Sequence, residues 1–162
     1  MSLNDDLIAA AGQGNAELVK KLIETGANVH AENDEALIIA VRSRSLGVVD
    51  ALIAAGANVR TRSDKALRIA AGQGSSWIVK SLLDAGADVH SKNDKALMNA
   101  VVYGCDTTVE TLLRNGADMH AKNDKAIKDA VRYSKKDPRR KKVVRVLTEY
   151  GADIDRFYNS NS

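Results

Sequence analysis

Apolar residues occur along the chain in short groups with helical spacing, and similar groups return about every thirty residues. Residues 64–93 show the pattern in full. The first group in this unit consists of Ala66, Leu67, Ala70 and Ala71. The second group consists of Ile78, Val79, Leu82 and Leu83. Each group fits one face of a short helix, so the pattern predicts two helices in each unit.

Polar residues and glycines separate these groups. Asp64 precedes the first group, and its carboxylate is expected to cap the first helix. The sequence Gly72-Gln73-Gly74 breaks that helix, and Ser76 is expected to cap the second. Gly86 is predicted to end the second helix in the left-handed conformation. Because neither helix can bury its apolar face alone, stacking of neighbouring units must supply the core.

The repeat is marked most clearly by a Gly-Ala-Asx string, whose spacings are 30, 30, 30 and 35 residues. This string begins at Gly26, Gly56, Gly86, Gly116 and Gly151. A second recurring string begins at Asn33, Ser63, Asn93 and Asn123. The predicted domain spans residues 1–155, with repeats at about 4–33, 34–63, 64–93, 94–123 and 124–155. Residues 156–162 form a C-terminal tail, in which Phe157 and Tyr158 are expected to cover part of the last repeat.

The unit resembles the ankyrin repeat over residues 3–155. The matching residues are Ala70-Ala71, Gly74, Ile78-Val79, Leu82-Leu83 and Gly86-Ala87-Asp88-Val89. Two features depart from the family pattern. The usual Thr-Pro-Leu-His is replaced by Lys65-Ala66-Leu67-Arg68, and the period is 30 instead of about 33. The missing residues lie between Val89 and Leu97, where ankyrin repeats place a hairpin.

The resemblance therefore implies an all-α fold, an ankyrin-type helix-turn-helix solenoid of five repeats with short loops and little or no β-hairpin. This compact variant also resembles the ankyrin proteins of amoeba-infecting giant viruses. As in the family generally, a partner is expected to bind on the concave side, through the loops and the first helices.

Composition adds few constraints to this picture. The 162 residues are enough for one domain, and only 4% are aromatic, so the core must be aliphatic. A lone cysteine, Cys105, excludes an internal disulfide and fits a reducing compartment. Neither a leader sequence nor a long apolar run is recognisable. We expect an intracellular protein, cytoplasmic or nuclear (in the host cell if viral), with no membrane association and no cofactor.

Charge is distributed unevenly among equivalent positions of the repeats. The position after the predicted cap changes from Asp5 and Glu35 to lysine in the next three repeats. The concave side should therefore become basic from the third repeat onward, which suits an acidic partner. A charged face kept only for solubility is the alternative. The predicted contact residues are Arg62, Lys65, Arg68, Lys92, Lys95, Met98, Tyr103, Lys122, Lys125, Lys128, Arg132 and Tyr133.

The fifth repeat is the most basic part of the chain. Residues 122–145 contain 11 Lys or Arg and 3 Asp, whereas the whole chain has a net charge of only +3. The inter-helix turn is predicted to be five residues longer here, running from Tyr133 to Lys142. It is read as a contact for phosphates or an acidic protein, as a nuclear-import-like signal, or as a solvated turn. Its basic residues are Lys135, Lys136, Arg139, Arg140, Lys141 and Lys142.

Histidine, tryptophan and cysteine are the further residue types that bear on chemistry. His30, His90 and His120 occupy one column, which spreads them too far apart for a shared metal ion. They are expected to bond to the backbone between adjacent loops. Trp77 is either an exposed anchor for a partner or packed against the neighbouring turn. Cys105 is read as a small, half-buried residue and not as a nucleophile.

The sequence contains no recognisable catalytic arrangement, so an enzyme is not expected. The leading hypothesis is a protein-interaction module with a basic concave face. One alternative is binding of nucleic acid or another polyanion through the fifth repeat, although only Tyr103 and Tyr133 offer stacking near the basic columns. Head-to-tail self-association of an acidic end with a basic end is a second alternative, but a monomer is expected.

Overall fold

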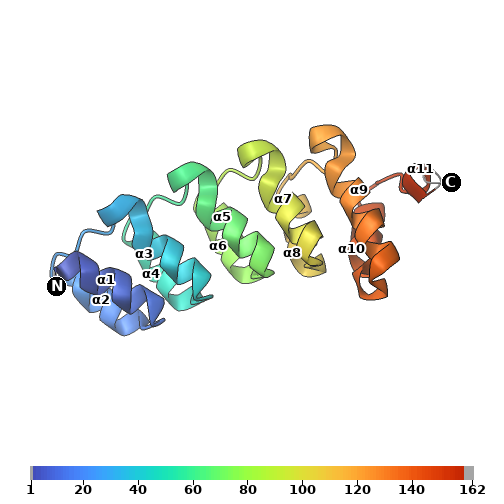
Figure 1. Cartoon of the computed structure of the whole chain (residues 1–162). Helices are drawn as coiled ribbons and strands as arrows, with labels where there is room; N and C mark the ends of the chain where they lie inside the picture. The colour runs from blue at the N-terminus through green and yellow to red at the C-terminus, as the bar shows by residue number, and fades with distance from the viewer. Residues whose placement is uncertain (1, 159–162) are drawn as a thin grey trace.

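The computed structural model describes residues 2–158, and regular structure in this range is entirely helical. Successive helices form pairs that are stacked side by side in one row (Figure 1). Residues 2–158 contain no strand, which confirms the prediction of an all-α solenoid without β-hairpins. The helices are α1 (Leu3–Gly12), α2 (Ala16–Glu24), α3 (Ala31–Arg42), α4 (Leu46–Ala54), α5 (Thr61–Gln73), α6 (Ser76–Asp84), α7 (Ser91–Tyr103), α8 (Asp106–Arg114), α9 (Ala121–Lys136), the 3₁₀-helix η1 (Pro138–Arg140), α10 (Lys141–Glu149) and α11 (Asp155–Tyr158).

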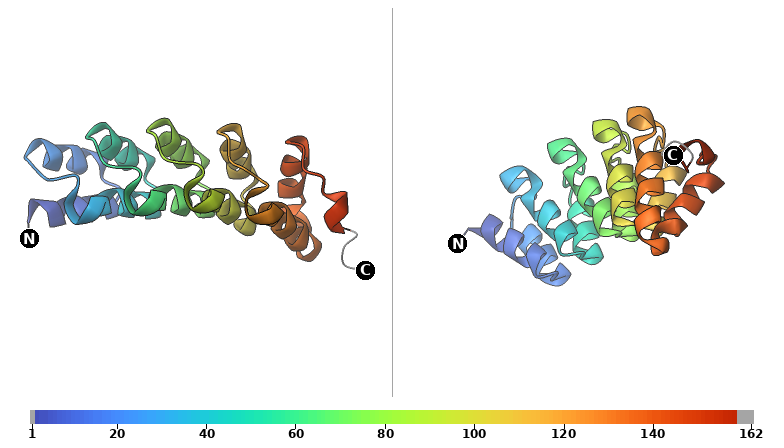
Figure 2. Two further views of the ribbon diagram at one scale, coloured as in Figure 1. Left: turned by 90° about the horizontal axis from the view of Figure 1, so that it is seen from above. Right: turned by 45° about the vertical axis from the view of Figure 1, so that its right-hand side comes forward.

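The helices form two parallel rows. The first helices α1, α3, α5, α7 and α9 contact one another in order, and so do the second helices α2, α4, α6, α8 and α10. Both rows can be followed in two further views (Figure 2). Residues that occupy equivalent positions in successive repeats are therefore spatial neighbours.

The core is a continuous aliphatic layer between the two rows. Its largest fully buried side chains on the first helices are Leu7, Leu37, Leu67, Leu97 and Ile127. Those on the second helices include Leu52, Leu82, Leu112 and Leu147. Buried alanines at positions such as Ala70 and Ala100 let adjacent first helices approach closely. The small share of aromatic residues is explained by this layer, which branched aliphatic side chains fill.

Glycine ends each second helix of the five pairs. Gly86 has a φ of 94°, and the equivalent glycines have φ values between 89° and 101°. The predicted left-handed end of the second helix is thus confirmed. The predicted cap at Ser76 is wrong, because α6 already begins at Ser76 and Ser75 occupies the cap position without a side-chain hydrogen bond.

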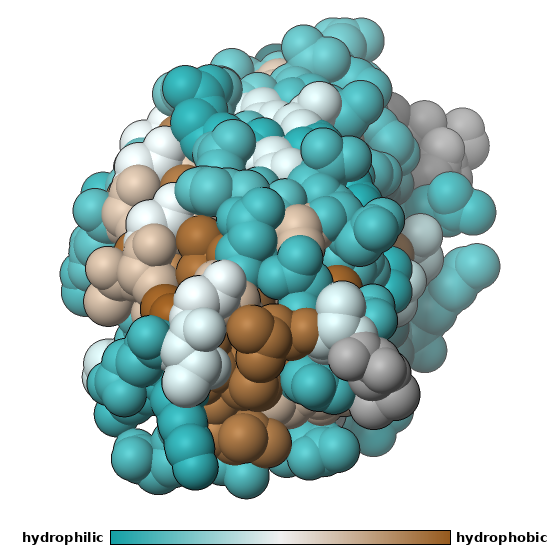
Figure 3. Space-filling model, turned by 90° about the vertical axis from the view of Figure 1, so that its left-hand side faces the viewer, coloured by the Kyte–Doolittle hydropathy of each residue, from teal (hydrophilic) through white to brown (hydrophobic). Residues whose placement is uncertain are grey.

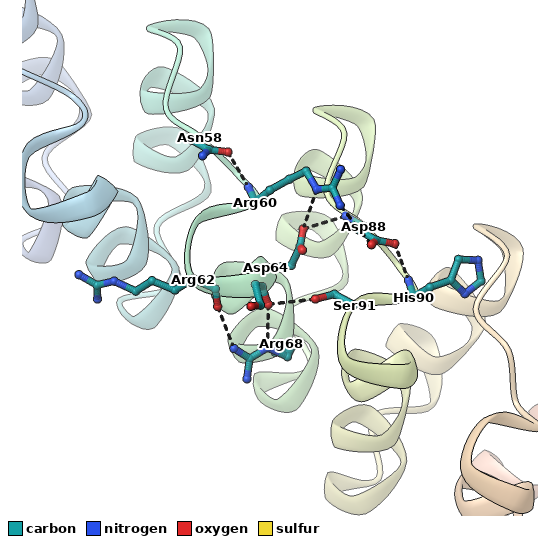
Figure 4. Close-up of polar contacts among 9 residues, drawn as sticks. Asn58, Arg60, Arg62, Asp64, Arg68, Asp88, His90 and Ser91 are labelled. Carbon is teal, nitrogen blue, oxygen red and sulfur yellow. Dashed lines mark hydrogen bonds and ion pairs between the residues drawn. The ribbon is translucent and has the colours of Figure 1, made fainter.

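Near its start, each first helix from α3 to α9 is kinked by three consecutive left-handed residues. In α5 these are Arg62, Ser63 and Asp64, with φ values of 51°, 56° and 54°. The Asp64 carboxylate does not cap its own helix as predicted: Oδ1 accepts a hydrogen bond from the backbone N–H of Asp88 at 2.8 Å (Figure 4). Asp34 and Asp94 make the same bond at 2.8 Å. These aspartates therefore connect the start of a repeat to the loop at its end.

The fifth repeat departs from the others. Helix α9 continues to Lys136 and α10 begins at Lys141, so only residues 137–140 lie between them, mostly in η1. The predicted turn from Tyr133 to Lys142 is therefore too long. Beyond α10, α11 folds back: Ser134 Oγ and the Tyr158 hydroxyl are 3.2 Å apart, and Phe157 packs against the core. This confirms the predicted cover over the last repeat.

The outer face of the first repeat is partly apolar. Leu3 and Leu18 are 44% and 37% exposed, and the view onto this end shows apolar side chains gathered on it (Figure 3).

None of the helices within residues 2–158 combines the length and the apolar composition that crossing a membrane requires.

Candidate interaction surface

A groove of about 600 Å³ lies on the side of the first helices, along α5 and between α3 and α7. We refer to it as the α5 groove. Its lining residues are Arg42, Arg44, Lys65, Arg68, Ile69, Gly72, Gln73, Asn99 and Tyr103. The groove thus combines side chains from three neighbouring repeats, which only the stacking of the repeats brings together.

The α5 groove is strongly cationic. Four of its lining residues are Lys or Arg, and none is Asp or Glu. Within residues 2–158, the side chains of Arg42, Arg44 and Lys65 make no hydrogen bond or ion pair with the protein. Arg68 is held in place, since its Nε and Nη2 donate to the carbonyls of Ser63 and Arg62, both at 3.2 Å. Three positive charges are therefore unpaired in one concave site.

Arg44 adopts an unfavourable backbone conformation. Its φ is 56°, in the left-handed region, whereas the equivalent positions are Gly14, Gly74 and Gly104, with φ values of 71°, 71° and 74°. A side chain in this region costs roughly 1–2 kcal/mol compared with glycine. A cation near a helix C-terminus stabilises the helix by about 0.3–1 kcal/mol, but Arg42 already supplies such a cation at the end of α3. The stability of the fold therefore does not account for an arginine at position 44.

Bonds between repeats fix the walls of the α5 groove. Asn99 Nδ2 donates to the Arg68 carbonyl and Gln73 Nε2 donates to the Arg42 carbonyl, each at 2.9 Å. The Tyr103 ring lies against Gly72, where a Cβ would stand 3.4 Å from two ring carbons. Tyr103 is nevertheless 65% exposed. The groove is thus pre-formed, with one accessible aromatic side chain at its edge.

Three of the predicted contact residues, Lys65, Arg68 and Tyr103, meet in this groove. The groove also contains Arg42 and Arg44, which sequence reasoning missed. A signal was present, because positions equivalent to Arg44 are glycine in three other repeats and positions equivalent to Arg42 are glycine in two. At position 44, where the equivalent glycines have a positive φ, an arginine indicates a side chain that the backbone does not favour.

Other predicted contact residues lie outside the groove. Arg62 Nη1 is 2.6 Å from Glu35 Oε2, and its Nη2 donates to the Glu32 carbonyl. Lys125 pairs with Asp129 at 2.8 Å, and Lys128 donates to the Asn123 carbonyl at 2.7 Å. These cations bind to the chain itself. The exposed members of the predicted set that lie outside the groove also include Lys92, Lys95, Lys122 and Arg132.

Met98 does not belong to a surface, because its side chain is only 2% exposed. Its column also contains Ile38, which is fully buried, and Arg68 and Lys128, whose cationic ends reach backbone carbonyls. An apolar side chain at this position is therefore buried in the interior. A long cationic side chain at the same position extends instead to a backbone carbonyl at the start of its own helix. The prediction of Met98 as a contact residue is wrong for this reason.

The basic residues of the fifth repeat are largely engaged with their surroundings. Arg140 donates to the Val102 carbonyl of the fourth repeat, and its guanidinium lies 5.3 Å from the centre of the Tyr133 ring. Arg139 pairs with Asp137 at 3.0 Å, and Lys135 donates to the Tyr158 carbonyl at 3.4 Å. The exposed basic residues of this repeat that make no hydrogen bond or ion pair within residues 2–158 are Arg132, Lys136, Lys141 and Lys142. Arg140 thus has a structural role.

The histidines pair with buried carboxylates. Nδ1 of His30, His90 and His120 lies 3.0, 3.1 and 2.6 Å from Oδ1 of the aspartate four residues later. The predicted bonds of these rings to the backbone are therefore wrong. At Asp124, the hydrogen bond with His120 lowers the pKa of the carboxyl below its usual value. Within the described part of the chain, no group of three or more His, Cys, Asp or Glu could hold a metal ion.

Two isolated residues complete the picture. Trp77 is 74% exposed, so it does not pack against the neighbouring turn. Cys105 is half-buried, and this burial raises the pKa of its thiol, which agrees with a small packing residue and disfavours a nucleophile.

Comparison with known proteins agrees with the architecture. A family model described as Ankyrin repeats (3 copies) matches residues 7–63 and 67–158. No curated protein matches the chain, so the likeness to giant-virus proteins stays a prediction. The matched segments cover most of the chain, and the paired helices have the arrangement that the repeat implies. The chain belongs to the ankyrin repeat family.

Proposed function

We propose that the chain is a protein-interaction module that binds an acidic segment of a partner protein in the α5 groove. Ankyrin repeats are generally protein-interaction modules, and proteins built from them are typically scaffolds without enzymatic activity. The observation that carries the proposal is the set of four cations in the groove, three of them unpaired, with no Asp or Glu among the lining residues.

Physical chemistry supports an anionic ligand. Unpaired cations in a concave surface raise the local positive potential and attract acidic groups, with a strong dependence on salt. The exposed Tyr103 adds an aromatic contact at the edge of the groove, and aromatic residues are frequent among the side chains that dominate binding energy.

Binding of nucleic acid is less well supported. Single-stranded nucleic acid needs several aromatic platforms for successive bases, and the α5 groove offers only Tyr103. In the fifth repeat, Arg140, Arg139 and Lys135 are engaged with other groups of the chain. Lys136, Lys141 and Lys142 of the fifth repeat are also exposed, and within the described residues they are unpaired. The two basic regions differ in that the α5 groove gathers its cations in one hollow that no Asp or Glu lines.

The test compares two charge reversals of equal size. Fluorescence anisotropy would measure binding of a labelled peptide containing six glutamates, at several salt concentrations. The variant Arg42→Glu/Lys65→Glu should weaken binding by about tenfold or more, which corresponds to about 1.4 kcal/mol. The control variant Lys136→Glu/Lys142→Glu should change the affinity by less than about threefold.

Equal losses in the two variants would contradict the assignment to the groove. A labelled oligonucleotide that binds more tightly than the peptide, at the same salt concentration, would contradict the choice of an acidic protein.

A further inference from the structure

We propose that the α5 groove selects a phosphorylated side chain within the acidic segment, and that Arg44 determines this selection. The inference rests on the proposed function and makes its ligand more specific.

The charge and the donor geometry of the α5 groove favour a phosphate group over a carboxylate. Arg42, Arg44 and Arg68 present three guanidinium groups around one hollow, together with the Lys65 ammonium. A carboxylate brings one negative charge, whereas a phosphate monoester brings about −1.5 to −2 and three strong acceptor oxygens. Guanidinium groups bind such oxygens in pairs with matching planar geometry. The set of donors therefore suits a phosphate group better than a single carboxylate.

Inside the α5 groove, no acidic side chain competes with a ligand for the cations. No Asp or Glu lines it, so its cations are not neutralised by the lining residues. Elsewhere the chain pairs its cations readily, as Arg62 does with Glu35 and Lys125 with Asp129. The α5 groove is thus a place where cationic side chains of neighbouring repeats converge without an acidic partner.

Arg44 has a backbone conformation that a non-glycine residue does not favour. Its left-handed conformation is occupied by glycine in the three equivalent turns. Outside the repeated left-handed loops of residues 32–34, 62–64, 92–94 and 122–124, Arg44 is the one non-glycine residue with a positive φ among those described. Strain of this kind at a cationic site points to a role for the side chain that lies outside folding.

The apolar wall completes the site. Ile69 and Tyr103 line the groove beside Gly72, and the Tyr103 ring lies against this glycine. A phosphorylated side chain with its stem against this wall would direct its oxygens towards the three guanidinium groups. The wall thus contributes contact area, and the cations contribute selectivity.

The experiment measures a ratio of affinities. Three labelled acidic peptides of identical sequence would carry tyrosine, phosphotyrosine or phosphoserine at the central position. Their binding to the full chain would be measured by anisotropy at one ionic strength, and the melting temperature of each protein variant would be recorded. At least one phosphopeptide should bind about tenfold or more tightly than the tyrosine peptide.

In the variant Arg44→Gly, this ratio should fall towards one, while the melting temperature stays unchanged or rises, because glycine suits the left-handed position. Arg44→Lys should retain part of the selectivity, since the charge remains but the planar donor pair is lost. The control variant Arg139→Gln, which removes an exposed cation outside the groove, should keep the full ratio.

The outcomes separate the two proposals. If the unmodified chain binds all three peptides with equal affinity, the proposed function stands and the phosphate inference is overturned. If no acidic peptide binds, both are overturned. If Arg44→Gly lowers the melting temperature and leaves the ratio unchanged, Arg44 is a structural residue and its assigned role is wrong.

Discussion

Single residues in the connecting loops show how an unfavourable backbone is maintained. Each connection from one repeat to the next contains, near the start of α3, α5, α7 or α9, a left-handed turn of three residues that ends in aspartate. Asparagine and aspartate tolerate this region better than other side chains. At Asp64 the carboxylate also accepts the backbone N–H of Asp88, so a donor in the next loop is satisfied. In the first repeat the neutral Asn4 makes the same bond to Asn28 at 2.8 Å.

This comparison gives the first prediction. Asp64→Ala should lower the free energy of unfolding by about 1–3 kcal/mol, because the partly buried N–H of Asp88 loses its acceptor. Asp64→Asn should cost much less, since Asn4 shows that an amide oxygen is sufficient. Urea denaturation measures both. Equal losses in the two variants would show that the negative charge, and not the acceptor, stabilises the loop.

The second prediction concerns the ionisation of Asp124. The hydrogen bond with His120 lowers the pKa of this carboxyl below 3.8. A lowered carboxyl pKa contributes stability above the unfolded value, and this contribution disappears as the pH falls through the folded pKa. Carbon NMR of the side chain should show Asp124 titrating below the usual range, and the variant His120→Ala should move the pKa upward. An unchanged pKa in that variant would contradict the role of the histidine.

At the scale of elements, apolar periodicity predicts the features that depend on neighbouring residues in the chain. It does not predict the features that depend on contacts between repeats. The helix pairs and the glycine that ends each second helix followed from the sequence, because each depends on residues close together in the chain. The end of α9 did not follow from the sequence, because residues 133–142 are mostly polar and carry little apolar periodicity. There the contact of Arg140 with the Val102 carbonyl joins residues 38 positions apart. The sequence predicts these aspartates as caps because the left-handed turn that each of them ends leaves no signal in apolar spacing.

The third prediction separates structural from exposed arginines in η1. Arg140→Ala should lower the free energy of unfolding by about 1–2 kcal/mol, because it removes a bond to a carbonyl of the fourth repeat and the contact with Tyr133. Arg139→Ala should change it by less than about 0.5 kcal/mol, since Arg139 is exposed and bonds only within η1 and its cap. Thermal denaturation compares the two. If both variants are equally stable, Arg140 does not anchor the repeat.

At the scale of the whole molecule, the stacking of similar helix pairs converts residues far apart in sequence into one surface. The α5 groove contains residues from position 42 to position 103, contributed by three successive repeats. The greatest density of positive charge in the sequence lies in the fifth repeat, yet many of those cations bind to the chain itself. We therefore propose that recognition depends on which charges are available and less on how many lie close together in the sequence.

The most direct test is to map where an acidic ligand binds on the folded chain. The amide NMR spectrum of the isotope-labelled protein would be recorded during titration with a hexaglutamate peptide. The account predicts that the largest shifts lie in residues 42–44, 65–73 and 99–103. Shifts concentrated in residues 135–142, or an even distribution over all exposed lysines and arginines, would contradict it.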